Sequence, residues 1–156
     1  MSEITLEQAE RIIDAIIERA RKLELRPISA VIVEPGAVVK AFKKEDGSAM
    51  LRFEMAYGKA YASLALGRSS DLVRQRAEQR PLFMEYLKGV ANGQMFCEGG
   101  GQLIRDDGGQ VIGAVGVTGD LQEKDDELAV FGIRAAGLKT DGDCEDMGKH
   151  VRLTRD

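Results

Sequence analysis

The sequence predicts an α+β fold in which a mainly antiparallel sheet is covered by helices on both faces. Three observations predict it: an amphipathic segment near the N-terminus, short apolar segments joined by tight turns, and a helical segment after the last of these. Strands joined by short turns pair antiparallel, and helices before and after them can cover the two faces of a sheet. The length of 156 residues suits one domain.

The first element is expected to be a helix over about residues 5–24. Apolar residues recur at helical spacing from Leu6 to Leu23, with charged residues between them. Thr5 and Gln8 match a Thr-x-x-Gln capping box, in which each side chain accepts a hydrogen bond from a backbone N–H that the helix leaves unpaired. This helix therefore has one apolar stripe to bury against the sheet.

An antiparallel hairpin is expected next. Residues 28–33 are apolar and rich in β-branched side chains, and residues 38–42 form a second short strand segment. Pro35 and Gly36 between them are typical of a turn. The two segments are therefore predicted to pair with each other.

Three helical segments should follow the hairpin. Residues 51–66 carry small side chains that suit a helix packed closely on a sheet, and Gly67 can end this helix. Ser69 can cap a polar helix that runs to about Gln79. A short helical segment is expected around residues 83–90.

The last third of the chain is predicted to contain three strands and a helix. The expected strands lie around residues 94–97, 103–104 and 111–117, with a hairpin turn at residues 106–109. A helix from about residue 121 to residue 136 should follow, because acidic residues gather in its first turns, where the helix dipole favours them.

The domain is expected to span residues 1–138, with a polar tail over residues 139–156 that lacks a hydrophobic period. Removing this tail should leave the fold intact. Asp141, Asp143 and Glu145 alternate as in part of a calcium loop, but the glycine and the final glutamate of such a loop are missing. We therefore expect no metal site.

Composition excludes several classes of function. The formal net charge is −4, so the chain lacks the basic footprint of a nucleic-acid-binding protein. It has no apolar run long enough to cross a membrane, and its first residues do not look like a signal peptide. Its two cysteines, Cys97 and Cys144, cannot form a disulfide framework. These features predict a cytoplasmic protein with reduced thiols.

Three stretches in order resemble the GlcG/HbpS family, whose members are often described as haem-binding or haem-degrading. They are the hairpin over residues 32–47, the Gly-Lys-Ala helix around residues 56–61, and the glycine-rich strands over residues 99–119 with the acidic helix start after them. The resemblance implies a profilin-like three-layer α/β/α sandwich with a five-stranded antiparallel sheet. It also implies a homo-oligomer, often a tetramer or an octamer.

The resemblance also implies a haem cofactor as a possibility. Iron ligands in haem proteins include His, Cys, Met and Tyr side chains. The chain departs from the family's pattern at Glu34, where Asp is usual, and its single histidine, His150, lies in the tail and is expected to be solvated. The other candidate iron ligands are Cys97, Tyr57, Tyr61 and the six methionines.

A pocket for a small anionic ligand is predicted around Lys59. This lysine lies among small residues on a helix that should pack on the sheet, and it is expected to face the Gly99–Gly101 turn and the strand end at Thr118 and Gly119. A cation beside backbone and hydroxyl donors suits a carboxylate, including a haem propionate. The glycine run has two interpretations, which are an anion-binding loop and a tight bend between strands.

Two functions of different classes follow. The first is a GlcG/HbpS-like protein that binds a small ligand such as haem. The alternative is a cytoplasmic catabolic enzyme, a lyase, isomerase or hydratase acting on a small organic acid. In the enzyme, Lys59 would stabilise negative charge and Glu34 would be its acidic partner, with Asp46, Glu123 and Asp125 as further candidates for that partner.

Overall fold

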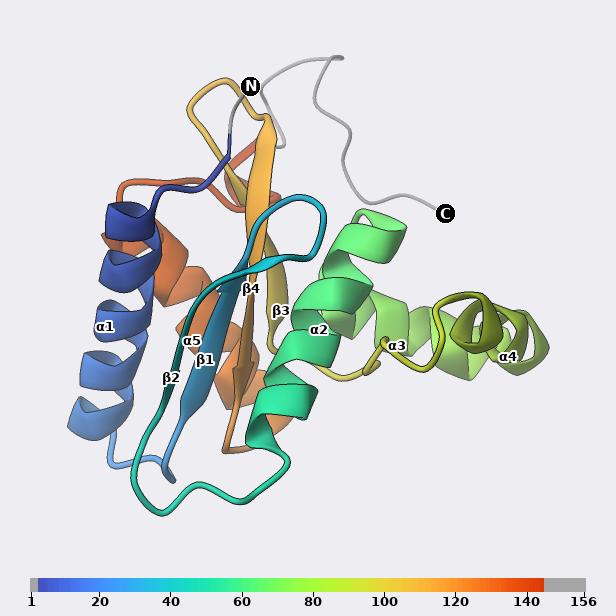
Figure 1. Cartoon of the computed structure of the whole chain (residues 1–156), viewed down its shortest axis with the longest axis horizontal. Coiled ribbons are helices and arrows are strands. Elements are labelled where there is room, and N and C mark those ends of the chain that lie inside the picture. The colour runs from blue at the N-terminus through green and yellow to red at the C-terminus, as the bar shows by residue number, and fades with distance from the viewer. Residues whose placement is uncertain (1–2, 145–156) are drawn as a thin grey trace.

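The computed structural model describes residues 3–144 and confirms the α+β class (Figure 1). Its centre is a four-stranded antiparallel sheet in the order β2-β1-β4-β3. The strands are β1 (Ser29–Val33), β2 (Val39–Lys44), β3 (Gly101–Arg105) and β4 (Val111–Thr118).

Helices cover both faces of this sheet. On one face lie α1 (Leu6–Lys22) and α5 (Gln122–Ala135), which also pack against each other, and on the other lies α2 (Arg52–Leu66). The two remaining α-helices, α3 (Ser70–Gln79) and α4 (Pro81–Val90), project away from the sheet beyond α2 (Figure 1).

The core divides into two layers because the side chains of β1 alternate between the faces of the sheet. Ala30 and Ile32 pack in the layer with α1 and α5, whereas Val31 and Val33 pack in the layer with α2. All of β1 is buried, as expected for an inner strand with helices on both sides.

The predicted capping box of α1 is confirmed. The Gln8 backbone N–H donates to Thr5 Oγ1 at 3.1 Å, and the Thr5 backbone N–H donates to Gln8 Oε1 at 3.0 Å. Gly67 ends α2 in the left-handed conformation, and the Ser69 hydroxyl caps α3 by accepting from the Leu72 N–H. The local signals in the sequence therefore set these helix ends.

The predicted five-stranded sheet is wrong, because the described chain has four strands. The segment 94–97 is not a strand: it lies against α2, and the Phe96 N–H donates to the Gly58 carbonyl at 3.1 Å. The contact depends on the missing side chain of Gly58, since a Cβ there would lie 2.6 Å from Phe96 Cβ. The segment thus uses its backbone to pack on a helix instead of pairing with a strand.

Residues 139–144 lie against the body of the protein. Lys139 forms an isolated antiparallel bridge with Arg105, whose Nε atom donates to Asp141 Oδ1 at 2.7 Å. Thr140 and Cys144 are buried, and a short 3₁₀ helix covers Gly142–Cys144. The domain boundary at residue 138 stays a prediction. His150 lies outside the described residues.

Among the described residues, no helix combines the length and apolar character needed to cross a membrane.

Candidate functional site

The candidate site begins with three side chains on one face of α2. Arg52, Met55 and Lys59 are spaced by three and four residues, which places them above one another on the helix. Arg52 is half-buried, and its Nη1 atom donates to Thr118 Oγ1 at 3.0 Å and lies 3.7 Å from Met55 Sδ. The face thus reaches the end of β4, where Thr118 lies.

Lys59 forms a buried ion pair deeper in the same face. Its Nζ atom lies 3.2 Å from Asp125 Oδ2 on α5 and donates to the Val117 carbonyl at 2.9 Å, and only 1% of the lysine is exposed. Burial lowers the pKa of Lys59, and the charge of Asp125 opposes this shift. Burial likewise raises the pKa of Asp125, with Lys59 opposing it. The pair ties α2 to β4 and α5.

The glycine turn before β3 closes over this lysine. A Cβ on Gly100 would lie 2.3 Å from the Val117 carbonyl oxygen and 3.1 Å from Lys59 Nζ. The Gly99 N–H donates to Gln122 Oε1 at 2.9 Å, and the Gly101 N–H donates to Ser70 Oγ at 2.7 Å. Because these donors are used within the chain, their contacts favour the tight bend over the anion-binding loop.

Asp126 occupies the next position along α5. Its carboxylate accepts from the Gly100 N–H and, at 2.9 Å, from Gln102 Nε2. Burial raises the pKa of Asp126, while these two hydrogen bonds lower it in part. Together with Lys59 and Asp125, this residue makes a polar layer between the sheet and the start of α5.

The structure brings most of the predicted site residues together. Lys59 meets Gly100 and Val117, and Thr118 follows directly and contacts Arg52. The glycine at 119 serves backbone packing, since a Cβ there would lie 2.3 Å from the Pro27 carbonyl oxygen.

Glu34, the predicted acidic partner of Lys59, lies elsewhere. It forms an ion pair with Lys40 at 3.0 Å, beside the turn between β1 and β2. Among the acidic candidates, Asp125 is the residue that contacts Lys59. A carboxylate on α5 can reach α2 because both helices begin at the same end of the sheet (Figure 1).

The candidate iron ligands are scattered. Cys97 lies in an apolar cluster with its Sγ atom 3.9 Å from Met84 Sδ, and burial raises the pKa of its thiol. The Tyr57 hydroxyl donates to the Ala37 carbonyl at 2.8 Å, and its ring stacks on Phe53. Met55 is the methionine at the candidate site.

Arg52 is the functional candidate that sequence reasoning missed. No ion pair with a described acidic residue includes it, although it is half-buried beside Lys59. The sequence could have pointed to Arg52 through its spacing of three and seven residues from Met55 and Lys59, which places all three on one helix face. Phe96 lies close by, with its ring centre 6.0 Å from Lys59 Nζ. The site therefore combines an arginine that has no acidic partner within residues 3–144, a thioether and an aromatic ring.

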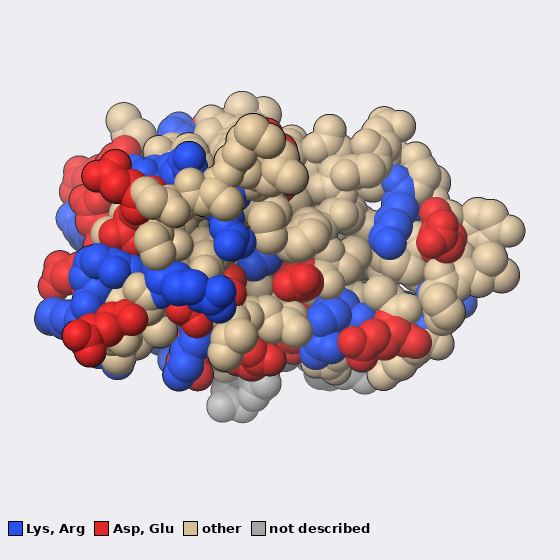
Figure 2. Space-filling model, turned by 90° about the horizontal axis from the view of Figure 1, so that it is seen from below, with Lys and Arg blue, Asp and Glu red and all other residues tan. Residues whose placement is uncertain are grey.

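The surface at this end of the molecule is divided by charge (Figure 2). Charged side chains of both signs crowd the side of α1, whereas they are sparse toward α4.

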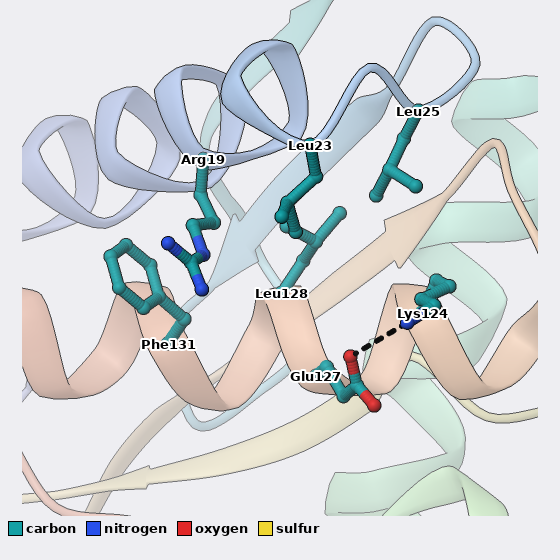
Figure 3. Close-up of a pocket in the computed structure, with 7 residues that line it drawn as sticks. All are labelled: Arg19, Leu23, Leu25, Lys124, Glu127, Leu128 and Phe131. Carbon is teal, nitrogen blue, oxygen red and sulfur yellow. Dashed lines mark ion pairs between the residues drawn. The ribbon is translucent and has the colours of Figure 1, made fainter.

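A separate hollow lies between α1 and α5. Arg19 stacks over the Phe131 ring at 5.1 Å from its centre, and Leu23, Leu25 and Leu128 lie around them (Figure 3). Its volume of about 130 Å³ is below the several hundred Å³ of typical ligand pockets.

Comparisons with known proteins agree with this architecture. The model of the family described as "haem degrading protein HbpS-like" matches residues 4–134. No curated protein matches the sequence.

Solved structures share the fold at low sequence identity. Klebsiella pneumoniae protein ORFY aligns with a TM-score of 0.79 and 23% identity, over 88% of this chain and 92% of that one. The PduOC:heme complex aligns with a TM-score of 0.78 and 22% identity, over 88% of this chain and 98% of that one. A double mutant of Streptomyces reticuli HbpS aligns with a TM-score of 0.75 and 22% identity, over 86% of this chain and 87% of that one.

Proposed function

Because this chain belongs to the HbpS-like family of haem-degrading proteins, we propose that it is a small-ligand-binding protein whose ligand is haem. The observation that carries the proposal is the family match, which spans residues 4–134 and so includes every element of the sheet. The structural likeness to the PduOC:heme complex supports the same ligand.

We place the ligand at the start of α2. Haem needs cations for its propionates, apolar contacts for its ring and an axial ligand for its iron. Arg52 offers a guanidinium without an acidic partner among the described residues, Phe96 offers an aromatic face, and Met55 offers a thioether. These residues fit haem in chemistry.

The deeper residues would support this site. Lys59, Gly99–Gly101, Thr118 and Gly119 would position Arg52 and add positive charge behind it. When bound, haem supplies a redox-active iron, and the chain's own residues hold and orient it.

Absorption spectroscopy tests the proposal. Haem titrated into the protein should give a sharp Soret shift at one haem per chain. Arg52→Gln should raise the dissociation constant about tenfold, since a charge-assisted hydrogen bond is lost. Arg11→Gln removes an exposed arginine of α1 and should leave binding unchanged. If the spectrum of the parent protein with haem is only the sum of the two separate spectra, haem is not the ligand. If Arg52→Gln binds haem as tightly as the parent does, haem binds but not at the start of α2.

We infer a homo-oligomer, a tetramer or an octamer, in the cytoplasm, as the resemblance and the free cysteines support. Sedimentation that finds only 17 kDa monomers at micromolar concentration would contradict the oligomer. The enzyme alternative is disfavoured, because the Val117 carbonyl and the Asp125 carboxylate occupy the Lys59 ammonium that would have to meet a substrate.

A further inference from the structure

Three sulfur-bearing side chains gather in the apolar cluster that α2, α3 and α4 share. Met84 and Met95 are 2% and 8% exposed, and the half-buried Cys97 packs against the same cluster. Residues 3–144 contain four methionines and two cysteines, so half of their sulfur atoms lie in this one place. The proposed haem site uses none of these three side chains, which we call the sulfur cluster.

Two separate parts of the chain build the sulfur cluster. Met84 lies on α4, and its Sδ atom is 3.9 Å from Cys97 Sγ. Met95 and Cys97 are two residues apart in the segment that precedes β3, and both pack in the apolar cluster. Phe96 between them lies beside α2, with its ring centre 6.0 Å from Lys59 Nζ. The segment therefore brings two sulfur ligands to the cluster, and α4 brings the third.

The separation of the two contacting sulfur atoms suits a shared metal ion. Because metal–sulfur bonds are about 2.3 Å long, one ion can reach both atoms across 3.9 Å with an angle of about 120° between the bonds. This is the angle expected for an ion with three ligands in one plane. Met95 is the third sulfur ligand that the cluster offers.

The types of ligand decide which ion fits. Thiolates and thioethers are soft ligands that select Cu(I), whereas Mg²⁺ and Ca²⁺ take oxygen ligands and Zn²⁺ is bound by Cys, His and carboxylate side chains. Within residues 3–144, no group of three or more His, Cys, Asp or Glu side chains could hold a metal ion. The side chains around the sulfur cluster are apolar and include Leu66, Val73 and Leu87. One thiolate with two thioethers therefore fits a monovalent copper ion better than a harder divalent one.

We propose that Met84, Met95 and Cys97 bind one Cu(I) ion. Cys97 binds as the thiolate, and its proton passes to solvent when the ion arrives. The thiolate and the ion carry opposite unit charges, so their complex avoids the cost of an unpaired charge in an apolar cluster. The half-exposed thiol gives the ion its way in. This inference does not rest on haem binding, which we place at Arg52 and Met55.

Competition for Cu(I) tests the site. The full chain, reduced and free of haem, is titrated with Cu(I) without oxygen against a coloured Cu(I) chelator, and one ion per chain should bind. Met84→Leu, Met95→Leu and Cys97→Ser should each raise the dissociation constant for Cu(I) at least about tenfold, because each removes one ligand. Leucine keeps the apolar volume of methionine, so both leucine variants should stay folded. Met50→Leu, at a methionine that is 84% exposed, is the matched control and should bind as the parent does.

X-ray absorption at the copper edge identifies the ligands. The bound ion should show three sulfur neighbours at about 2.3 Å, and the Cys144→Ala variant should keep them. If the parent leaves all Cu(I) with the chelator, or if both leucine variants bind as tightly as the parent, the sulfur cluster only packs the core and the proposal is wrong. Loss of Cu(I) in Cys144→Ala with intact binding by Cys97→Ser would place the ion elsewhere. If Cys97→Ser abolishes the Soret shift with haem, the thiol is an iron ligand and the copper site is overturned.

Discussion

At the scale of single residues, the buried pair of Lys59 and Asp125 has the largest expected effect on stability. Both side chains are almost fully enclosed, and each has further hydrogen bonds, from Lys59 to the Val117 carbonyl and from the Asp120 N–H to Asp125. Two buried charges stabilise little when they are together, but one of them alone is costly.

Lys59→Met should therefore lower the free energy of unfolding by about 3–5 kcal/mol, because it leaves Asp125 buried without a cation. Urea denaturation measures this loss. Lys59→Met combined with Asp125→Leu should recover much of it, since no buried charge remains. If Lys59→Met alone unfolds at the parent's urea midpoint, Asp125 does not depend on the lysine.

Asp126 should give stability a measurable dependence on pH. Its folded-state pKa is raised above the ordinary value of 3.8, mainly by burial. The folded state then holds a proton that the unfolded chain has already released. The contribution of Asp126 to stability is therefore fully present below pH 3.8 and is lost as the pH rises through the raised folded-state pKa.

Asp126→Asn removes this titration while keeping an oxygen that accepts hydrogen bonds. The variant should gain stability relative to the parent as the pH rises from about 3.8 toward neutrality. Chemical denaturation at several pH values measures the difference. Asp107→Asn, at the exposed turn between β3 and β4, is a control that should track the parent. A constant difference at every pH would contradict the raised pKa of Asp126.

At the scale of elements, the close approach of α2 to β4 decides where the site lies. A Cβ on Gly116 would lie 1.9 Å from the Ala56 carbonyl oxygen, so the helix backbone rests directly on the strand. In a neighbouring contact, a Cβ on Gly101 would lie 2.3 Å from the Lys59 carbonyl oxygen. The glycines therefore fix the depth at which Lys59 reaches Asp125.

Gly116→Ala should cost about 3 kcal/mol, because two backbones must separate to admit a methyl group. Gly36→Ala is the matched control: no atom lies within 4 Å of the new methyl, and its backbone does not have a positive φ. Thermal unfolding compares the two. Equal melting temperatures for the Gly116→Ala variant and the parent would show that α2 can move away freely.

At the scale of the whole molecule, residues just after 138 contact the body of the protein through Arg105. Arg105 is buried and donates to Asp141, and Cys144 is buried as well. A chain that ends at residue 138 loses these contacts, whereas one that ends at residue 144 keeps them.

Truncation after Leu138 should therefore cost about 3 kcal/mol, the loss expected when a buried ion pair is broken. Truncation after Cys144 removes only residues outside the described part and serves as the control. Urea unfolding of the two shortened chains measures the difference. If both are as stable as the full chain, the boundary predicted at residue 138 stands.

The sequence by itself determined the local elements of this protein. The capping box at Thr5 and Gln8, the cap at Ser69 and the glycine after α2 each act through neighbours within a few residues, so their chemistry can be read from the chain. The hairpin turn and the glycine-rich β4 are local for the same reason. The sequence also predicted that Lys59 lies near the glycine turn, because the small residues beside it indicated close packing of this helix on the sheet.

Only the tertiary structure decided the partners that lie far apart in the chain. Asp125 pairs with Lys59 across 66 positions, and nothing in local spacing separates it from Glu34 as a partner. The segment 94–97 looks like a strand, but Gly58 lets it bond to a helix backbone instead. Arg52 is a candidate because the fold half-buries its guanidinium with no acidic partner among residues 3–144, and the spacing of the sequence does not show this. These contacts depend on which distant side chains the fold brings together and removes from water. The local periodicity of the sequence reports only on neighbours within a few residues, so it cannot predict them.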